Sequence, residues 1–260
     1  MKCKVCGMDT RVVFAHKILC KYTSSYFYCD ACGFLRTEDP YWLDEAYGSV
    51  LSASDTGLVQ RNVIVSGVLS AMLFFIFDRH GKYLDIGGGC GLLTRIMRDI
   101  GFDFYWSDKY CSNLLAGGFE APPDASFVAA TAFEVLEHQT DPIGFLQEIL
   151  AQARTRNIII STQLFEHAPP KPEDWSYYAF ETGQHISFYQ MRTLRVIAEK
   201  LGLHCYSRGW IHLFSDKKIN SLMFNMFASP VAAPVFSFLP KCIMKSRTRT
   251  DQLNIICRNR

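Results

Sequence analysis

From about residue 81 onward, short apolar runs alternate with stretches in which apolar residues recur every three or four positions. The short runs are typical of buried strands, and the longer stretches are typical of amphipathic helices. This alternation predicts an α/β fold in which helices cover both faces of a mainly parallel sheet. The runs expected to form strands are KYLDI, FDFYWS, FVAATAF, NIIIST, HCYSRGW and QLNIIC.

The helices between these strands carry recognisable end signals. The helix LLTRIMRDI places its apolar residues on one face and is expected to stop at Gly101. In DPIGFLQEILAQAR, Asp141 is expected to cap the helix and Pro142 to take the first helical position. A third helix, SFYQMRTLRVIAEKLG, opens with Ser187 and Gln190 at the spacing of a capping box.

Residues 41–80 are expected to form a helical linker or cap. The run Asn62–Phe77 is long, uncharged and apolar, and Asp78, Arg79 and His80 follow it at once. The run is shorter than a comfortable bilayer span. The pattern therefore favours a buried helix over a transmembrane one.

A second apolar run, Ile219–Pro240, contains no charged residue. Pro230 and Pro234 argue against one continuous spanning helix, so we expect two short helices within a helical insert at about 215–245. These helices would form either a lid over the substrate or an apolar surface that rests on a membrane. The lysines that flank the run are Lys217, Lys218, Lys241 and Lys245.

Composition narrows the class of protein. With 260 residues, 49% of them hydrophobic, the chain is able to bury a full core beside a small appendage. The formal net charge of +2 provides no excess of positive charge for binding nucleic acid phosphates, so we expect no nucleic-acid partner. The first residues do not read as a secretory signal, so we expect a cytoplasmic protein, membrane-peripheral if the second apolar run rests on lipid.

Four of the ten cysteines form two C-x-x-C pairs near the beginning of the sequence. Cys3 and Cys6 lie in CKVC, and Cys29 and Cys32 lie in CDAC. Two such pairs place four thiolates around one tetrahedral Zn²⁺, a closed shell with no open position for chemistry. The spacing therefore predicts a structural zinc ribbon in residues 1–40, whereas the scattered remaining cysteines are interpreted as small hydrophobic residues.

The stretch YLDIGGGCGLLTRIMRDIG places a glycine-rich loop between a predicted strand and a predicted helix. That position suits a nucleotide-like ligand at the carboxyl end of a sheet. Neither glycine register has the third glycine of a dinucleotide fingerprint, and no Gly-Lys-Ser/Thr follows for a phosphate loop. Asp85 precedes the loop, and Asp108 ends the next strand at the distance expected for a carboxylate that holds a ribose hydroxyl pair. The combination suits an adenosyl ribose without a pyrophosphate.

These motifs resemble those of class I S-adenosylmethionine (SAM)-dependent methyltransferases. The segment Asp85–Gly91 resembles their first motif, D-x-G-x-G-x-G, and TAFEVLEHQTDP resembles their fourth-strand motif. The resemblance covers residues 81–260 and implies a Rossmann-like, doubly wound sheet of seven mostly parallel strands. It implies SAM as the cofactor. The cofactor-binding residues that it implies are Asp85, Gly87, Gly89, Gly91, Asp108 and Glu134, with Asp108 on the ribose and Glu134 beside the methionine end.

The whole layout is similar to one subgroup of these enzymes. A four-cysteine zinc module followed by this core and by QHISFYQMRTL resembles methyltransferases that modify sugars in antibiotic and surface-polysaccharide pathways. The resemblance implies methylation of a sugar or related small molecule. A lipid-linked sugar would suit the apolar run Ile219–Pro240. In these enzymes the histidine that matches His185 lies beside the acceptor, and an imidazole is able to accept its proton, so we expect His185 to be the general base. His138 and Tyr178 are the alternative bases, and the aromatic run DWSYYAF is either core or a loop over the acceptor.

Two other functions fit parts of the sequence. Some RNA base methyltransferases also join a zinc ribbon to this core, although the near-neutral charge disfavours them. The chain could also be a non-catalytic interaction module that retains the cofactor site. Turnover of SAM to S-adenosylhomocysteine with an acceptor would exclude the second alternative.

Overall fold

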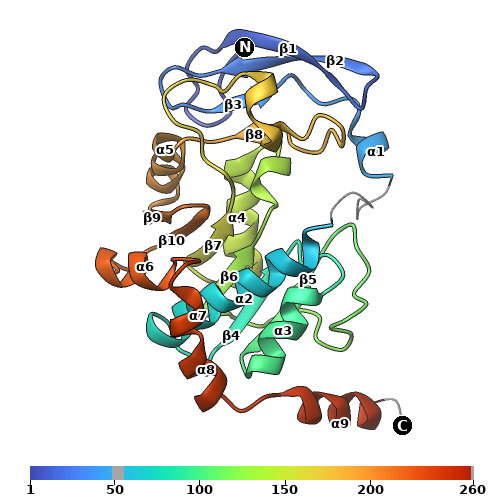
Figure 1. Cartoon of the computed structure of the whole chain (residues 1–260), viewed down its shortest axis with the longest axis vertical. Coiled ribbons are helices and arrows are strands. Elements are labelled where there is room, and N and C mark those ends of the chain that lie inside the picture. Colours follow the sequence, from blue (N-terminus) through green and yellow to red (C-terminus); the bar gives the residue numbers. More distant parts are fainter. Residues whose placement is uncertain (49–55, 259–260) are drawn as a thin grey trace. The chain divides into compact units, whose positions relative to one another are not determined.

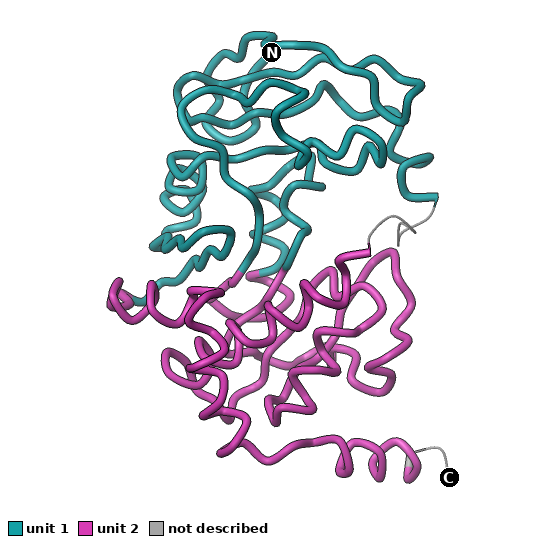
Figure 2. Tube along the Cα trace, in the orientation of Figure 1, with its two compact units in different colours: residues 1–52, 133–149, 160–217 teal, residues 53–132, 150–159, 218–260 magenta. Residues whose placement is uncertain are grey.

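The computed structural model describes residues 1–48 and 56–258, and the chain divides into two compact units (Figure 2). Unit 1 comprises Met1–Ser52, Phe133–Ile149 and Ile160–Lys217. Unit 2 comprises Ala53–Ala132, Leu150–Ile159 and Lys218–Arg260. The division cuts across the boundaries expected at residues 40 and 80, because each unit is assembled from segments far apart in the sequence.

Unit 1 contains a four-stranded sheet of order β1-β2-β3-β8 (Figure 1). Leu19, Cys20 and Lys21 connect the first two strands, and Leu19 and Cys20 both have a φ of 55°, as the central residues of tight hairpin turns do. The short strand β8 pairs antiparallel with β3, although it comes from the second half of the chain. The sheet therefore joins β2 and β3, which flank Cys29 and Cys32 in the sequence, to β8, which follows His185. The strands are β1 (Arg11–Ile18), β2 (Tyr22–Tyr28), β3 (Leu35–Thr37) and β8 (Ser187–Phe188).

An aromatic core holds this sheet to the segment that leads into β8. Tyr26, Trp42 and Phe188 are almost fully buried. The indole Nε1 of Trp42 donates to the carbonyl of Gly183 at 2.8 Å, which satisfies its one polar group inside the core. The other helices and strands of unit 1 are α1 (Leu43–Ala46), η1 (Leu136–His138), η2 (Pro172–Asp174), η3 (Ser176–Tyr178), α5 (Met191–Leu201), β9 (His204–Arg208) and β10 (Ile211–Ser215).

The start of α5 differs from the expected capping box. Gln190, not Ser187, is the N-cap, and it exchanges hydrogen bonds with Thr193. Ser187 lies in β8 and donates its hydroxyl to the carbonyl of Gln139 at 2.7 Å. The Ser187–Gln190 prediction was wrong because pairing with β3 keeps the backbone extended up to the true cap.

Unit 2 contains the parallel strands of the predicted Rossmann-like fold. β4 pairs parallel with both β5 and β6, and α3 follows the glycine-rich loop. Gly101 ends α3 with a φ of 125°, as expected. The elements are β4 (Lys82–Ile86), α3 (Leu92–Ile100), β5 (Asp103–Ser107) and β6 (Ala129–Ala132); α4 (Pro142–Ala153) and β7 (Asn157–Ser161) continue from one unit into the other.

The strand order of the larger sheet is β5-β4-β6-β7-β10-β9, and β10 pairs antiparallel with β9. The Rossmann-like α/β fold is thus confirmed, although the described residues form six strands in this sheet and not seven. The predicted strand QLNIIC lies in helix α9 (Thr248–Arg258). Periodicity over so short an apolar run does not separate strand from helix. The missed strand is β10, whose five residues are all buried.

The long apolar run forms α2 (Leu58–Phe75), which is long and apolar enough to cross a membrane by length and composition alone. More than half of it is buried inside the protein, as a core helix would be. Phe75 stacks on Phe227 with ring centroids 4.4 Å apart, so α2 supports the helical insert. The insert contains three short helices where two were expected: α6 (Ser221–Phe227), α7 (Ala233–Phe236) and α8 (Phe238–Ile243).

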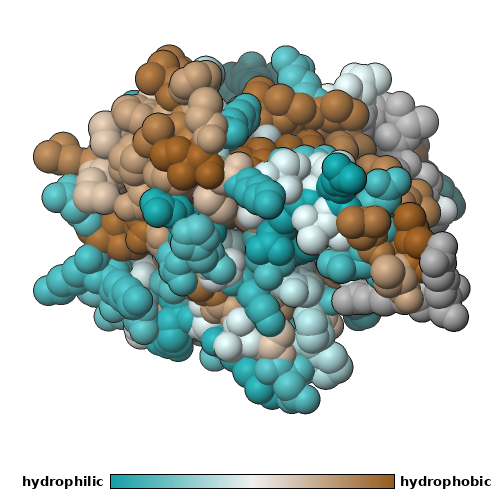
Figure 3. Space-filling view, turned by 90° about the horizontal axis from the view of Figure 1, so that it is seen from below, coloured by the Kyte–Doolittle hydropathy of each residue, from teal (hydrophilic) through white to brown (hydrophobic). Residues whose placement is uncertain are grey.

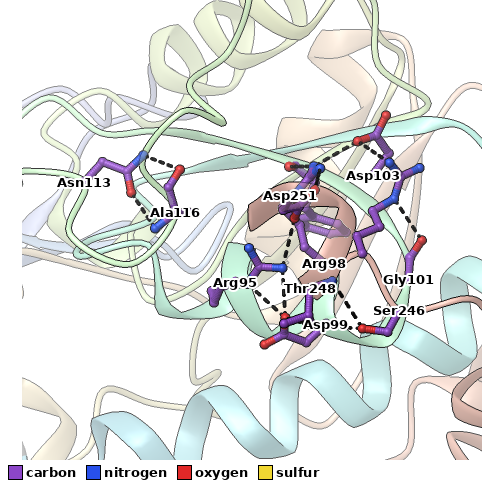
Figure 4. Close-up of polar contacts among 12 residues, drawn as sticks. Arg95, Arg98, Asp99, Gly101, Asp103, Asn113, Ala116, Ser246, Thr248 and Asp251 are labelled. Carbon is purple, nitrogen blue, oxygen red and sulfur yellow. Dashed lines mark hydrogen bonds and ion pairs between the residues drawn. The ribbon is translucent and has the colours of Figure 1, made fainter. Parts of the chain in front are cut away.

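Helix α9 is held to α3 by buried ion pairs (Figure 4). Arg98 donates to both carboxylate oxygens of Asp251 at 2.7 and 2.8 Å, and it also donates to Asp103. Burial alone would raise the pKa of Asp251, but the hydrogen bonds and charges of Arg98 and Arg95 hold this pKa below its usual value. Because both carboxylate oxygens of Asp251 are bound, the contact is bidentate and fixes the position of α9 against α3.

Candidate active site

The four glycines of the loop in unit 2 differ in backbone conformation and in the space around them. A side chain at Gly88 would lie 2.8 Å from the Trp106 ring and 2.9 Å from the Asp85 carboxylate, so Gly88 permits close packing. Gly87, Gly89 and Gly91 have positive φ angles of 66°, 54° and 88°, which glycine adopts without strain. Gly89 has open space where a side chain would project. The loop therefore exposes its backbone to a ligand at Gly89, whereas Gly88 packs against Trp106 and Asp85.

Asp85 supports the loop from inside unit 2. The side chain is 2% exposed, and its two oxygens accept hydrogen bonds from Thr131 at 2.8 Å and Thr94 at 3.2 Å. Burial raises the pKa of Asp85 to about 7, the two threonine hydroxyls oppose this rise, and the charge of Asp108 adds to it. Asp85 thus joins β4, β6 and α3 beneath the glycines, which favours a positioning role in cofactor binding.

Asp108 lies at the end of β5 and is bonded to backbone amides. One carboxylate oxygen accepts from Gly89 N at 2.9 Å, and the other accepts from Tyr110 N and Cys111 N at 2.7 and 2.8 Å. A carboxylate has about four lone-pair sites, so one more bond to a ribose hydroxyl fits this arrangement without rearrangement. A two-oxygen grip on the ribose would require one of these amide bonds to give way.

Glu134 comes two residues after β6, at the start of a segment of unit 1. Its φ of 54° is unusual for a residue with a side chain. The Glu134 carboxylate accepts from Ser161 Oγ at 2.6 Å, and the same Oγ accepts from Glu134 N at 2.8 Å. The reciprocal pair stabilises the unusual backbone, which is a feature that clusters at functional sites.

A polar cluster in unit 1 brings together residues that are distant in the sequence. We call Tyr47, Glu137, His138, Tyr177 and His185 the histidine cluster. The rings of His138 and His185 lie 4.9 Å apart and nearly perpendicular, and His138 Nδ1 is 3.0 Å from Tyr47 Oη. Tyr177 Oη donates to Glu137 Oε1 at 2.5 Å. The arrangement joins two imidazoles, one carboxylate and two phenols, the side chains that move protons in enzymes.

The hydrogen bond of His185 selects its tautomer. Nδ1 lies 2.7 Å from the carbonyl oxygen of Tyr177, and a carbonyl only accepts, so Nδ1 carries the hydrogen. In the neutral ring Nε2 is therefore the basic nitrogen. The same bond fixes the orientation of the ring relative to the Tyr177 backbone.

The structure separates two adjacent tyrosines. Tyr178, proposed as an alternative base, lies in the aromatic core and donates its hydroxyl to the Pro170 carbonyl at 2.8 Å. Tyr177 is the member of the histidine cluster, although the sequence did not single it out. The two tyrosines lie in the 3-10 turn η3, where adjacent side chains point about 120° apart, so one residue separates the two environments.

The four predicted zinc ligands converge in unit 1. Cys3 Sγ lies 3.5 Å from Cys32 Sγ, Cys6 Sγ lies 3.4 Å from Cys29 Sγ, and all four sulfur atoms lie within 4.8 Å of one another. Four sulfurs at about 2.3 Å from a tetrahedral ion would be about 3.8 Å apart. The donor set and its spacing therefore fit one zinc ion.

These features define an α/β protein that has a glycine loop suited to a nucleoside-type cofactor in unit 2 and the histidine cluster in unit 1. The model of a methyltransferase-domain family matches residues 61–208. The chain belongs to this family. The prediction of a SAM-dependent methyltransferase is thereby confirmed at the level of the family. No curated protein matches the chain.

Several solved structures are similar to the chain at low sequence identity. The structure titled TnmH is 18% identical with a TM-score of 0.48, covering 68% of this chain and 62% of its own. Mitomycin 7-O-methyltransferase MmcR is 16% identical with a TM-score of 0.42, covering 60% and 53%. Magnesium protoporphyrin IX methyltransferase from Synechocystis, with SAM bound, is 15% identical with a TM-score of 0.41, covering 67% and 90%. The chain thus spans less than two thirds of the first two proteins.

Proposed function

We propose that the protein transfers the methyl group of SAM to a small hydroxylated molecule, with a sugar or related compound as the favoured acceptor. The observation that carries this proposal is the histidine cluster of unit 1. Nε2 is the basic nitrogen of neutral His185, and the ring lies beside His138 and the hydrogen-bonded pair of Tyr177 and Glu137. A base of this kind suits an acceptor that must lose a hydroxyl proton. Membership in the methyltransferase family supports the reaction type.

SAM would be held by the residues that the sequence identified for it. The open backbone at Gly89 and the adjoining Asp108 carboxylate fit a ribose, with Gly87, Gly91 and Glu134 shaping the same loop and the turn after β6. The sulfonium methyl is already activated when SAM is bound. The chain's own residues therefore need to bind and orient the acceptor, exclude water and remove one proton.

His185 is the proposed proton acceptor, and His138 assists it. Burial, and then the charge of His185, lower the pKa of His138 to about 3, while a bond to the Gln184 backbone opposes the shift. His138 is therefore neutral at physiological pH. Its hydrogen bond to Tyr47 fixes its ring, and the ring in turn packs against His185. His185, fixed through Nδ1, takes the hydroxyl proton on Nε2 as the methyl group transfers.

Zinc is the second proposed cofactor, with a structural role. Cys3, Cys6, Cys29 and Cys32 would bind it in a closed shell, which leaves no position for an acceptor. Thr193 donates to the carbonyl of Cys32 at 2.8 Å, so the metal site would stabilise the start of α5 as well as the N-terminal turns.

The test is the release of S-adenosylhomocysteine by purified protein, measured against three sets of acceptors: nucleotide-linked sugars, simple phenols and structured RNA. The proposal expects turnover with a hydroxylated small molecule and a labelled methyl group on its oxygen. Turnover with RNA alone would move the protein to the RNA alternative. SAM binding without turnover on any acceptor would support the non-catalytic alternative instead.

A further inference from the structure

The helical insert of unit 2 exposes large apolar side chains on its outer side. Leu222 is 80% exposed, Val231 90% and Phe238 68%. Figure 3 shows apolar residues gathered at the upper left of that view, on the side where Figure 1 places α6 to α8. Proteins rarely expose apolar residues in such density unless the surface binds something. The members of this α6–α8 surface are Leu222, Met223, Met226, Val231, Val235, Phe238, Leu239 and Ile243.

The insert has a separate inner side that completes the core of unit 2. Phe224 and Phe227 are buried, and the Phe227 ring stacks on Phe75 of α2. A Cβ on Gly67 would lie 3.7 Å from the Ala233 Cβ, in van der Waals contact, so α7 packs on α2. Since the inner side alone provides the packing, the exposed apolar residues are not required for the fold. An apolar helix with one uncovered side needs a second apolar environment.

The charge around this surface indicates the nature of that environment. Residues 217–250 contain six Lys and Arg residues and no Asp or Glu. Because the whole chain has a formal net charge of +2, the remaining residues sum to −4. Lys241 lies in α8, Lys218 precedes α6 by three residues and Lys245 follows α8 by two, and all three are exposed. An apolar centre with a basic rim is complementary to a bilayer that carries anionic headgroups.

We infer that the α6–α8 surface docks on an anionic lipid bilayer, with its apolar side chains in the boundary between headgroups and acyl chains. The helices have four to seven residues; Pro230 lies between α6 and α7, and Pro234 lies in the first turn of α7. They therefore lie in the interface and do not span it. A second copy of the chain is a poorer occupant, because pairing the same surface would bring two basic rims together.

The inference is tested by sedimenting the full-length protein with vesicles of phosphatidylcholine, with and without phosphatidylglycerol. We expect binding to the anionic vesicles that weakens as salt is raised. Val231→Ser combined with Phe238→Ser should reduce the bound fraction at least roughly tenfold, because two exposed apolar side chains no longer enter the lipid. Lys241→Glu combined with Lys245→Glu should abolish the preference for phosphatidylglycerol.

Controls separate docking from general stickiness or misfolding. Val12→Ser removes an exposed apolar side chain of unit 1 and should leave vesicle binding unchanged. Phe238→Trp supplies a probe whose fluorescence should be quenched by lipids brominated on the acyl chains. Equal sedimentation of all variants, or no binding to either vesicle, would overturn the inference. So would a dimer without lipid that Val231→Ser and Phe238→Ser convert to monomers.

Discussion

His138 and His185 face each other in unit 1 with their rings 4.9 Å apart and their planes at 83°. His138 is hydrogen-bonded to Tyr47, and burial lowers its pKa to about 3. A group with so low a pKa is a weak acceptor of protons near neutral pH. In the mechanism that we propose, His185 is therefore the base and His138 is the residue that positions it.

We predict that His185→Ala lowers kcat by roughly a hundredfold or more, the usual contribution of a general base. Affinity for SAM, measured by calorimetry, should not change, since His185 is assigned to the acceptor and not to the cofactor. His204→Ala is the matched control, because His204 is exposed on β9. Near-normal turnover of His185→Ala together with loss of turnover in His138→Ala would reverse the assignment.

The raised pKa of Asp85 predicts an unusual dependence of stability on pH. The folded pKa is about 7, above the ordinary value of 3.8, so between these pH values the folded state binds more protons than the unfolded state. The contribution of Asp85 to stability is therefore greatest below about pH 4 and is lost as pH rises towards 7. Asp85→Asn imitates the protonated side chain and should not suffer this loss.

The pH dependence of stability is measured by denaturant unfolding of the natural protein and of Asp85→Asn, both without cofactor. The free energy of unfolding of Asp85→Asn, relative to the natural protein, should rise by about 1.4 kcal/mol for each pH unit between 4 and 7. A difference that stays constant over this range would show that the Asp85 carboxyl has an ordinary pKa despite its burial.

Sequence reasoning succeeded where the signal is local. The glycine loop from Gly87 to Gly91 and the helix end at Gly101 need only a few neighbouring residues, so their spacing predicted them. It failed where distant segments meet. β8 is extended because β3 pairs with it, and Tyr177 belongs to the histidine cluster because Glu137 accepts its hydrogen bond. No local pattern encodes those contacts.

A third prediction concerns the cysteine cluster. All four predicted ligands lie within residues 1–40 of the sequence. In the structure, β3 follows Cys32 and pairs with β8, two residues after His185, and Arg192 donates to the Asp30 carbonyl at 2.7 Å. We therefore expect Cys29→Ser to lose zinc, to lower the thermal midpoint and also to reduce turnover.

Metal analysis, thermal unfolding and the methyl-transfer assay on the same preparation test this prediction. Cys20→Ser is the control, because Cys20 is exposed and lies outside the cluster, and it should retain metal, midpoint and turnover. Zinc-free Cys29→Ser with full turnover would mean that β3 and β8 hold the His185 segment without help from the metal.

The last prediction concerns the attachment of α9 to α3. Asp251 and Arg98 have side chains that are each 3% exposed, so removing one charge leaves the other poorly solvated. Asp251→Asn should lower the free energy of unfolding at pH 7 by about 3 kcal/mol. This value is the lower end of the range for broken buried ion pairs, and we choose it because Asp103 and the Phe104 carbonyl still bind Arg98. The folded pKa of Asp251 is depressed, so this stabilisation is complete above the ordinary carboxyl pKa and is lost as pH falls through the folded value. The difference between the two proteins should therefore shrink in acid.

Hydrogen exchange in Asp251→Asn should be faster in α9 alone. The control Asp124→Asn removes an ion pair whose carboxylate is 92% exposed, so it should change neither the free energy of unfolding nor the exchange rates. A loss of protection in β4 as large as that in α9 would mean that Asp251 supports the whole of unit 2 and not the attachment of one helix.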